Sequence, residues 1–521
     1  MDILNHQDIR DILQKRFEGD FFYSLKDLPH PHTLKDSKLG AEMVKEAICQ
    51  NQEILIVGDY DVDGILSVVI MMSFFDAIGY KNIRYHIPNR FSDGYGIKVH
   101  LIKQLVASNF NGIIITVDNG ISAFEVGEYC RENNIRLIIT DHHMPQEKLP
   151  LANAIINPQQ PNCNFQQKSI CGASIAWYFC NSIKIALDLK ISMLDLLKYV
   201  AIATIADMMP LTHVNKILVK KGIEVFRNST KKPDLLLKTL FKTPKFDSQD
   251  ISFNLTPLLN SAGRLGDAKV VVDFFLSKKE EETHFIFNQL KNINQQRKNL
   301  VEEILMESKN FIKENKYCII AYKEDWNEGV LGIIATKLAE QYNKPAFAFK
   351  IENSILKGSG RSDGKIDIFQ TLLIQKELFL HFGGHSQAIG LSLSYENLDA
   401  FLDIFKNAKP LLQEEKHNIL GKINLDMIDQ KLLQILEEFQ PYGQANPYPH
   451  FVLENVTILE SKPIKQVHQK LLFRNQIEGM IFFSNEFYNK NDKVNLCVTL
   501  QESLYSKTPT LIIKEISKCP S

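Results

Sequence analysis

The sequence lacks the features of a secreted or membrane-bound protein. Its 8 cysteines are scattered and include no CxxC pair, which favours reduced thiols over a disulfide framework or a zinc knuckle. The first residues, MDILNHQDIRD, carry charges where a signal peptide needs an apolar core. The longest apolar run, residues 65–75, is shorter than the roughly 20 residues of a membrane span. We therefore expect a cytoplasmic protein with no membrane contact.

A strong net charge is also missing, because 60 Lys and Arg residues balance 61 Asp and Glu residues. A globally basic protein would indicate nucleic acid as a partner. Here only a local basic surface could bind it, since the field of a charge acts over about a Debye length. The length of 521 residues predicts about three or four domains, and a hydrophobic content of 45% lets each bury a core of its own.

Short apolar strands alternate with helices between residues 53 and 210. Strands are predicted at 54–57, 112–117 and 137–140, with a buried helix at 65–78 and an amphipathic helix at 124–133. This alternation predicts an α/β fold with a parallel sheet, whose ligands gather at the carboxyl ends of the strands. We expect this catalytic domain, with an N-terminal extension, to occupy residues 1–275.

Three further segments are predicted after this domain. Residues 276–316 contain a charged stretch with neither Gly nor Pro, interpreted as a long connecting helix, with a core helix of either neighbour as the alternative. Residues 317–415 contain a second, smaller α/β domain with a strand at 318–322, a helix at 330–341 and a strand at 346–349. Residues 416–521 contain short strands separated by turns, which predict an OB-like β-barrel of roughly five strands.

The motif GDYDVDG at residues 58–64 follows the first strand directly. Its three carboxylates, Asp59, Asp61 and Asp63, alternate along the loop, so we expect them to converge, and like charges this close require a cation between them. The same letters open an EF-hand loop, but the twelfth position, which needs a bidentate Glu, is Ile70 in an apolar helix. A solvated acidic loop is the bland alternative.

Three other acidic or histidine groups follow later apolar segments: Asp118 in TVDNG, the trio Asp141, His142 and His143 in ITDHH, and Asp207 in IATIADMMP. Each alone would more often be a helix cap, a turn residue or a structural histidine. Together they lie where one sheet edge would gather them. Carboxylates with histidine and no thiolate favour Mn²⁺ or Mg²⁺ over zinc, and two such ions clamp the oxygens of a phosphoryl displacement.

In this order the four motifs resemble those of the DHH phosphoesterases, and residues 357–391 resemble the DHHA1-like accessory domain of that superfamily. The stretches IPNRFSDGYGI, SAGRLGDA, WNEGVLGIIATKLAE and PYGQANPYPHF are similar to the RecJ-type exonucleases within it. Two departures are Asn327, where the relatives usually have His, and Ile389, where they usually have Ala. The resemblance implies a single-strand-specific DNA exonuclease that acts in DNA repair and recombination.

The resemblance also implies roles for individual residues. Asp61, Asp63, Asp118, His142 and Asp207 are expected to bind two Mn²⁺ or Mg²⁺ ions, with Asp118 as a bridge, and Asp59 is expected to support the first ion. His143 is expected to contact the scissile phosphate, with Asp141 orienting the site.

A second set of residues resembles the 5′-phosphate pocket of the RecJ-type enzymes: Arg90, Arg264, Ser359, Arg361 and the turn Gly383, Gly384 and His385. Arginine forks hold phosphate through paired hydrogen bonds, and glycines let the backbone approach it. The pocket implies 5′→3′ degradation that releases 5′-mononucleotides. Ion pairs with carboxylates are the alternative role for these arginines.

The expected partners are single-stranded DNA, a single-strand-binding protein and a helicase. Candidate DNA contacts of the C-terminal domain are Lys465, His468, Lys470 and Arg474, with ordinary solvated surface as the alternative. Two other functions are open: a DHH-family phosphodiesterase acting on short RNA or signalling dinucleotides, and a catalytically inactive replication scaffold. Degradation of a long single strand would exclude the first, and loss of the ligands would indicate the second.

Overall fold

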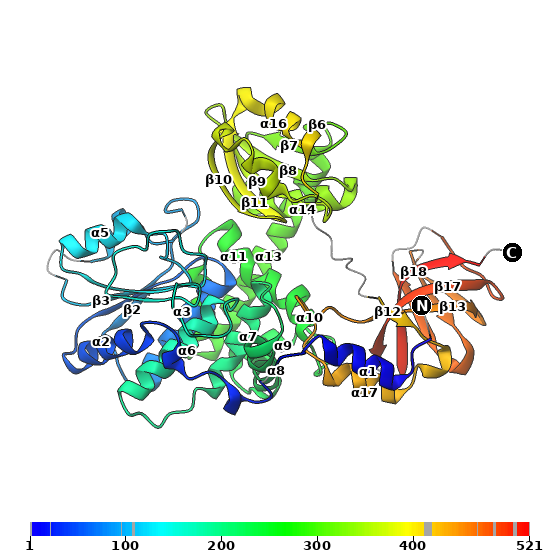
Figure 1. The fold of residues 1–521 in the computed structure, drawn as a ribbon, viewed down its shortest axis with the longest axis horizontal. Helices are drawn as coiled ribbons and strands as arrows, with labels where there is room; N and C mark the ends of the chain where they lie inside the picture. Colours follow the sequence, from blue (N-terminus) through cyan, green and yellow to red (C-terminus); the bar gives the residue numbers. More distant parts are fainter. Residues whose placement is uncertain are drawn as a thin grey trace. The chain divides into compact units, whose positions relative to one another are not determined.

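The computed structural model describes residues 3–20, 22–94, 96–106, 110–410, 419–465, 467–482, 486–503 and 508–519. The chain divides into two compact units, one formed by residues 1–86, 96–256 and 417–521, the other by residues 87–95 and 257–416. Figure 1 shows the ribbon coloured along the chain. Among the described residues, no helix has both the length and the apolar content to cross a membrane. The cytoplasmic location stays a prediction.

The parallel sheet predicted from the alternating pattern is confirmed. Its strand order is β2-β1-β3-β4-β5, and every neighbouring pair is parallel. The strands are β1 (Ile54–Val57), β2 (Ile83–His86), β3 (Ile113–Val117), β4 (Arg136–Thr140) and β5 (Ala154–Ile156). The three strands predicted from sequence are β1, β3 and β4. The edge strands β2 and β5 were not predicted, because β2 is only partly buried and β5 has three residues.

Helices cover both faces of this sheet, and Figure 1 shows α2 and α5 on opposite sides of it. The catalytic part contains α2 (Ser37–Cys49), α3 (Val62–Ala77), α4 (Val99–Leu105), α5 (Phe124–Glu132), α6 (Gly172–Ala186), α7 (Leu197–Ala206), α8 (His213–Asn228), α9 (Lys232–Lys238) and α10 (Ser248–Asp250). Helices α3 and α7 are apolar around almost their whole circumference, as expected of helices buried on all sides.

The second unit contains the long helix and the smaller α/β domain. Its helices are α11 (Thr256–Leu265), α12 (Lys269–Leu276), α13 (Glu280–Ser308), α14 (Leu331–Tyr342), α15 (Ile368–Leu373) and α16 (Leu398–Ile404). Its mixed sheet has the order β10-β11-β9-β8-β7-β6. The strands are β6 (Ile312–Glu314), β7 (Ile319–Lys323), β8 (Ala346–Glu352), β9 (Ile355–Arg361), β10 (Phe379–His385) and β11 (Ala388–Ser394).

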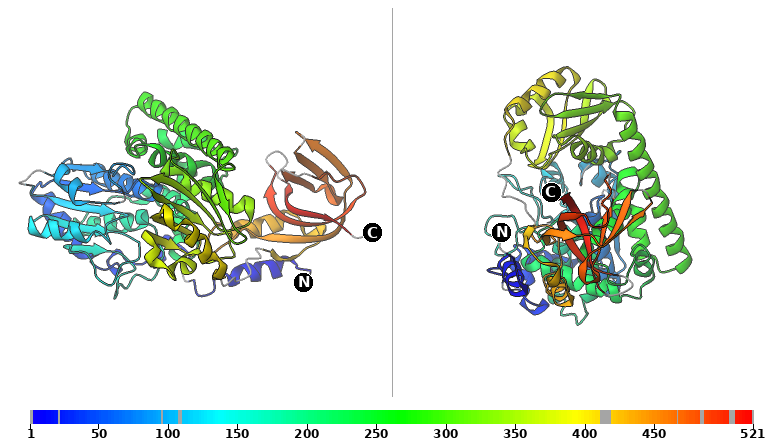
Figure 2. Two further views of the ribbon diagram at one scale, coloured as in Figure 1. Left: turned by 90° about the horizontal axis from the view of Figure 1, so that it is seen from above. Right: turned by 90° about the vertical axis from the view of Figure 1, so that its right-hand side faces the viewer.

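Helix α13, the long green helix in the right-hand view of Figure 2, ends eight residues before the predicted boundary at 316. The chain leaves it because residues 312–314 form β6 and pair with β7. Phe287 stacks on Phe274 of α12, whereas Val301 and Ile304 pack in the core beneath α14. The long helix predicted from the sequence is therefore confirmed, and it connects α12 to the accessory sheet within the second unit.

The C-terminal sheet has seven strands among the described residues, not the roughly five predicted. Its order is β12-β13-β17-β18-β16-β15-β14. The strands are β12 (Ile419–Lys422), β13 (His450–Thr457), β14 (Glu460–Ile464), β15 (His468–Leu472), β16 (Glu478–Phe482), β17 (Lys493–Glu502) and β18 (Pro509–Lys518), with α17 (Gln430–Glu438) after β12. Strand β12 is short, and β14 is charged and contains Pro463, so neither shows the alternating pattern of a strand.

The N-terminal helix α1 (His6–Lys15) contributes to the C-terminal core. Ile9, Leu13 and Phe17 are buried there with apolar residues of α17 and the seven-stranded sheet. The domain boundaries at 275, 316 and 415 stay a prediction. The packing adds that the first helix shares its core with the last domain rather than with the parallel sheet.

Candidate metal centre

The GDYDVDG motif forms the turn between β1 and α3. Gly58 N donates to His86 O at the end of β2 (3.0 Å), which keeps the chain at the sheet edge. Asp61 is the N-cap of α3, and its carboxylate accepts a hydrogen bond from Gly64 N at 3.0 Å. A Cβ atom on Gly64 would lie 2.6 Å from the backbone N of Asp59. Glycine therefore lets the turn fold back and bring its first two carboxylates together.

The third carboxylate of the motif, Asp63, lies in the first turn of α3 and is only 2% exposed. Its Oδ2 accepts from Gly172 N at 2.6 Å, and its Oδ1 accepts from Ala173 N at 2.7 Å. These two N–H groups are the first of helix α6 and have no partner within their own helix. The start of α6 therefore fixes both oxygens of Asp63.

Asp118 follows the last residue of β3 and is 2% exposed. Its backbone φ of 61° lies in the left-handed region, which Asp adopts more readily than most residues. Asp118 N donates to Thr140 O at 3.0 Å, so the turn stays tied to the end of β4. A Cβ atom on Gly172 would lie 2.5 Å from the Cβ of Asp118. The carboxylate is thus held between the sheet edge and the start of α6.

Asp141 is the hub of the DHH turn after β4 and is 1% exposed. Its Oδ1 accepts from His142 N (2.7 Å), His143 N (3.1 Å) and His143 Nδ1 (2.7 Å), and its Oδ2 accepts from Ile121 N (2.9 Å). Both oxygens are therefore used to shape the turn. This geometry supports the orienting role expected of Asp141.

The ring of His143 lies at the surface of the cluster, with 47% of its side chain exposed. Partial burial alone would lower its pKa, but the hydrogen bond and charge of Asp141 outweigh it and raise the pKa to about 9. Without a metal, His143 is therefore a cation at neutral pH. A cationic side chain here can donate to a phosphate oxygen.

His142 is more deeply buried and lies within the acidic cluster. Its Nε2 atom lies 3.2 Å from Asp118 Oδ1, 3.6 Å from Asp207 Oδ2 and 3.7 Å from Asp63 Oδ2. Asp207 is the C-cap of α7, so this apolar helix delivers its last carboxylate to the sheet edge. Burial lowers the pKa of His142, which favours the neutral form that a metal ligand needs.

Three groups of these side chains have ligand atoms within 4.8 Å of one another: Asp59, Asp61 and Asp118; Asp63, His142 and Asp207; and Asp118, His142 and His143. The structure therefore brings together the four separate motifs. The first two groups are disjoint, and Asp118 of the first touches His142 of the second. Asp118 therefore belongs to one ligand group and contacts the other.

The electrostatics of the cluster favour either protonated carboxylates or a bound cation. Burial, followed by the neighbouring carboxylates, raises the pKa of Asp118 well above its ordinary value. Burial is also the main reason that the pKa of Asp63 is raised and that of Asp207 reaches about 9, with further increases from nearby carboxylates. Divalent cations would satisfy the buried acceptors Asp118 Oδ1 and Asp207 Oδ2.

The donor set matches Mn²⁺ or Mg²⁺, because five carboxylates and a histidine are hard or borderline ligands. Cys171 is the nearby thiol, but burial raises its pKa well above the ordinary value and its Sγ contacts Ser174 and Thr204 instead. A thiolate site for zinc is therefore not formed by this residue.

Sequence reasoning missed two positions that shape the cluster. One is the Gly172–Ala173 start of α6, for which the sequence gives no signal, because nothing marks it as a partner of Asp63. The other is Asn119, whose Nδ2 donates to Val57 O (3.1 Å) and Val117 O (2.9 Å) and so ties β1 to β3. Its place in the VDNG motif was a signal that could have been used.

The residues predicted to bind the 5′-phosphate all lie in the second unit. The sheet register places Arg361 and His385 on either side of Ala388, and Ser359 and Gly383 on either side of Gly390. These two rows share a sheet face, because residues two apart on a strand point the same way. A Cβ atom on Gly332 at the start of α14 would lie 2.8 Å from the Arg361 guanidinium.

The set contains two other arginines, Arg264 and Arg90. Arg264 Nη1 donates to Gly329 O at 3.1 Å, beside the start of α14. Arg90 belongs to the same unit. Gly384 has a φ of 145°, and a Cβ atom there would lie 2.3 Å from Ala388 O, so the turn requires glycine.

The two departures from the relatives have local explanations. Asn327 is the N-cap of the short helix Glu328–Val330, and its side chain accepts from Gly329 N at 2.8 Å. Ile389 is 2% exposed in the core of the accessory domain. It points to the sheet face opposite the Arg361 row, because it alternates with Ala388 and Gly390 along β11.

The C-terminal candidates for DNA binding are only partly available. Lys470 Nζ lies 2.7 Å from Glu478, and Arg474 makes two bonds of 2.8 Å to Asp426. Both therefore form surface ion pairs, which fits the ordinary solvated surface that the sequence left open. The ring of His468 lies 5.5 Å from Phe482, which is 48% exposed, so an aromatic pair is present on this surface.

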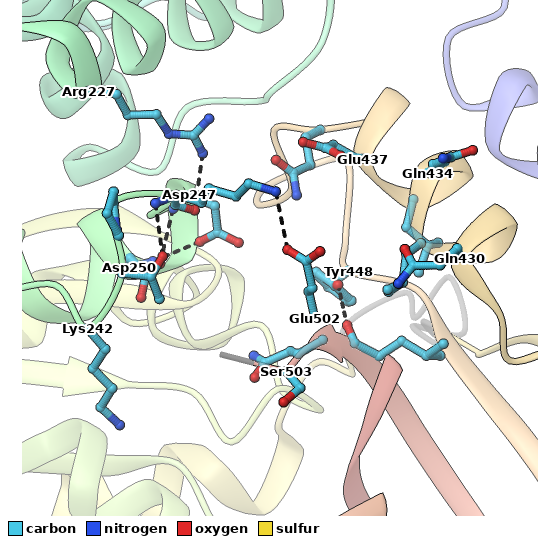
Figure 3. A pocket seen from close by; sticks show the side chains of 18 of the residues that line it. Arg227, Lys242, Asp247, Asp250, Gln430, Gln434, Glu437, Tyr448, Glu502 and Ser503 are labelled. Atoms are coloured by element: carbon cyan, nitrogen blue, oxygen red, sulfur yellow. Dashed lines mark hydrogen bonds and ion pairs between the residues drawn. The ribbon is translucent and has the colours of Figure 1, made fainter. Parts of the chain in front are cut away.

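A hollow of about 700 Å³ lies where the catalytic helices meet the C-terminal domain. Figure 3 shows Arg227 donating to the backbone carbonyl of Lys245 at 3.3 Å and an ion pair reaching Glu502, which is the 3.2 Å pair with the Lys245 side chain. Its side chains carry both signs of charge, and none of the described residues that line it belongs to the metal cluster. The hollow therefore adds nothing to the metal chemistry.

Comparisons with known proteins match all three parts of the chain. The N-terminal domain of the DHH family matches residues 53–204, the DHHA1 domain residues 315–409, and the RecJ OB domain residues 419–515. The last match agrees with the OB-like C-terminal domain predicted from sequence.

Curated relatives and a solved structure agree with these matches. The chain is 30% identical to the single-stranded-DNA-specific exonuclease RecJ of Haemophilus influenzae, covering 88% of this chain and 84% of the relative. It is 31% identical to that of Escherichia coli, covering 86% and 83%. The crystal structure of RecJ in complex with Mn²⁺ from Thermus thermophilus has the same fold, with a TM-score of 0.81 at 22% identity, covering 100% of this chain and 79% of that chain.

Proposed function

The chain belongs to the RecJ family of single-stranded-DNA-specific exonucleases, and we propose that it degrades single-stranded DNA from the 5′ end and releases 5′-mononucleotides. This activity would serve DNA repair and recombination. The observation that carries the proposal is the convergence of five buried or half-buried carboxylates and His142 at one sheet edge. A catalytically inactive scaffold would have no reason to keep this costly cluster of like charges.

Two ions are proposed, one held by Asp59, Asp61 and Asp118 and the other by Asp63, His142 and Asp207. Bound divalent ions would supply charge neutralisation at the phosphodiester and acidification of the attacking water. The protein side chains position the ligand groups. Asp118 holds the two ligand groups together, and Asp141 fixes the turn that carries both histidines.

His143 is proposed to contact the scissile phosphate. Its Nδ1 is held by Asp141 at 2.7 Å, and the ring is half exposed at the surface of the cluster. In the metal-free protein, the hydrogen bond and charge of Asp141 raise the pKa of this ring to about 9, and a ring held in this way can donate its second N–H to a phosphate oxygen. The role is binding and orientation of the phosphate, with proton donation to the leaving oxygen as a second role that the same atom allows.

The 5′ end is proposed to be recognised in the accessory domain. Ser359, Arg361 and His385 share one face of its sheet, and Gly332 at the start of α14 lies next to Arg361 and Ser359. Their hydroxyl, guanidinium and imidazole groups are donors suited to a terminal phosphate. We infer single-stranded DNA as the substrate, with a single-strand-binding protein and a helicase as working partners.

The proposal is tested with long single-stranded DNA, the matching duplex and a dinucleotide, each in Mn²⁺ and in EDTA. We expect metal-dependent release of mononucleotides from the long single strand and little from the duplex. Asp118→Asn serves as the inactive control. Preferred hydrolysis of the dinucleotide would instead place the chain with the short-substrate DHH phosphodiesterases, and an absence of hydrolysis in any metal would favour the scaffold.

A further inference from the structure

The start of helix α6 lies against two of the proposed metal ligands, although none of its residues is a ligand. Gly172 N and Ala173 N donate to Asp63 at 2.6 and 2.7 Å, one to each carboxylate oxygen. The Cα of Gly172 lies so close to Asp118 that a Cβ atom would be 2.6 Å from Asp118 Oδ1. One short segment therefore contacts a member of each proposed ion site.

The capping of α6 is unusual in a way that explains these contacts. Its N-cap is Cys171, whose side chain makes no cap hydrogen bond. Helices usually begin with Ser, Thr, Asp or Asn, whose oxygen accepts from the first N–H groups. Here Asp63, a residue of helix α3, accepts those bonds instead. The positive end of the α6 dipole also favours the ionised carboxylate, against the cost of its burial.

The Cys171 side chain extends this connection to a third ligand. Its Sγ lies 3.3 Å from Thr204 Oγ1, and Thr204 is on α7, one turn before Asp207. Thr204 Oγ1 also donates to Val200 O at 2.7 Å within α7. The start of α6 thus links α3, which carries Asp63, to the end of α7, which carries Asp207.

We propose that Gly172, Ala173 and Cys171 are positioning residues for the metal centre, and that they set the affinity of the two ions separately. The Ala173 N–H acts on Asp63 alone and therefore on the ion held by Asp63, His142 and Asp207. The missing side chain of Gly172 makes room for Asp118 and therefore affects both ions. This inference rests on the proposed two-ion function.

Ala173→Pro isolates the N–H group. Proline lacks an N–H but is tolerated in the first turn of a helix, where the N–H has no partner within the helix. Glu125→Pro is the matched control, because Glu125 is the second residue of α5, as Ala173 is of α6, and its side chain is exposed. Figure 1 shows α5 on the side of the sheet opposite α2. Both variants carry the same backbone restriction.

Gly172→Ala isolates the steric role. Its matched control is Gly127→Ala in α5, where a Cβ atom would lie 2.5 Å from Leu151 O, an equal crowding away from the cluster. Cys171→Ala is a milder third variant that removes one thiol and adds no strain. It is expected to weaken only the ion that uses Asp207, by severalfold.

The test is a Mn²⁺ titration of each full-length protein, read from the EPR signal of the free ion, with circular dichroism to confirm the fold. Loss of a group that holds a metal ligand costs about 10–100-fold in metal affinity. We expect this loss for one class of ion in Ala173→Pro, for both classes in Gly172→Ala, and for neither in the controls.

Three results would overturn the inference. One is a folded Ala173→Pro protein that binds both ions as the wild type does. Another is equal weakening by each variant and its control. If Ala173→Pro does not fold, unchanged Mn²⁺ binding by Gly172→Ala and Cys171→Ala would refute it. A wild-type protein that binds no Mn²⁺ in this assay would overturn the proposed function itself, which is a separate outcome.

Discussion

Replacing Asp118 by Asn tests the proposed bridge between the ions. The change keeps the shape of the side chain and removes its charge from a cluster whose ligand atoms lie within 4.8 Å. At that spacing, two carboxylates repel by about 3.5 kcal/mol at an effective dielectric constant of about 20. The metal-free variant should therefore be more stable than the wild type by a few kcal/mol, and it should lose its metal-dependent activity.

The assay measures thermal unfolding in EDTA and in Mn²⁺, together with hydrolysis of single-stranded DNA. In EDTA at alkaline pH, the Tm of Asp118→Asn should rise by about 2–4 °C for each kcal/mol of repulsion that is relieved. Stabilisation by Mn²⁺ should shrink, and turnover should fall by at least about 100-fold, more than the loss of an outer group would cause.

Asp76→Asn is the matched control, since Asp76 ends the same helix α3 and pairs with Lys81 at 2.7 Å on the surface. A surface ion pair contributes only about 0–1 kcal/mol, so this variant should behave as the wild type in every assay. Near-normal turnover of Asp118→Asn in Mn²⁺ would refute the bridging role. An unchanged Tm in EDTA would refute the repulsion argument.

The remaining predictions concern pH, the 5′ end and the C-terminal surface. The pKa of Asp207 is raised from 3.8 to about 9, so in EDTA its protonated form contributes stability that is lost as the pH rises through this window. The Tm in EDTA should therefore fall as the pH rises, and Mn²⁺ should abolish this trend. A Tm in EDTA that does not change with pH would contradict the prediction. Arg361→Ala should weaken use of 5′-phosphorylated DNA by roughly 1.5–3 kcal/mol and affect 5′-hydroxyl DNA less, with Arg131→Ala on α5 as the control; equal losses would reject the pocket. Phe482→Ala should weaken binding of long single strands by about 1–3 kcal/mol if bases stack there, measured by fluorescence anisotropy, while cleavage of very short strands should stay unchanged.

The parallel sheet and its carboxylates were predictable because their signals are local. Residues 54–57 are a four-residue apolar run, and three carboxylates follow it directly. A buried parallel strand has this pattern, and ligands of such sheets collect at the strand ends. Asp118 and His142 could be assigned to the same edge by the same rule, before any distance was known, whereas Asp207 ends helix α7, to which the rule does not apply.

Features that depend on long-range pairing were not predictable. Arg474 has the appearance of a DNA contact, but its partner Asp426 lies 48 residues earlier in the chain. From the sequence, helix α1 was assigned to an extension of the catalytic domain. Its apolar face instead packs beside α17, more than 400 residues away. The hydrogen bonds from the start of α6 to Asp63 join residues 109 positions apart in the chain. They use backbone N–H groups, which every residue except proline carries.

The central proposal is that the protein degrades single-stranded DNA from the 5′ end and needs a metal ion to do so. The direct measurement uses single-stranded DNA labelled separately at each end, incubated with the full-length protein in Mn²⁺, with the first labelled product identified. We predict that a labelled 5′-mononucleotide is released first from the 5′ end, and that no product forms in EDTA. Release from the 3′ end, release of longer fragments, or equal digestion of duplex DNA would contradict it.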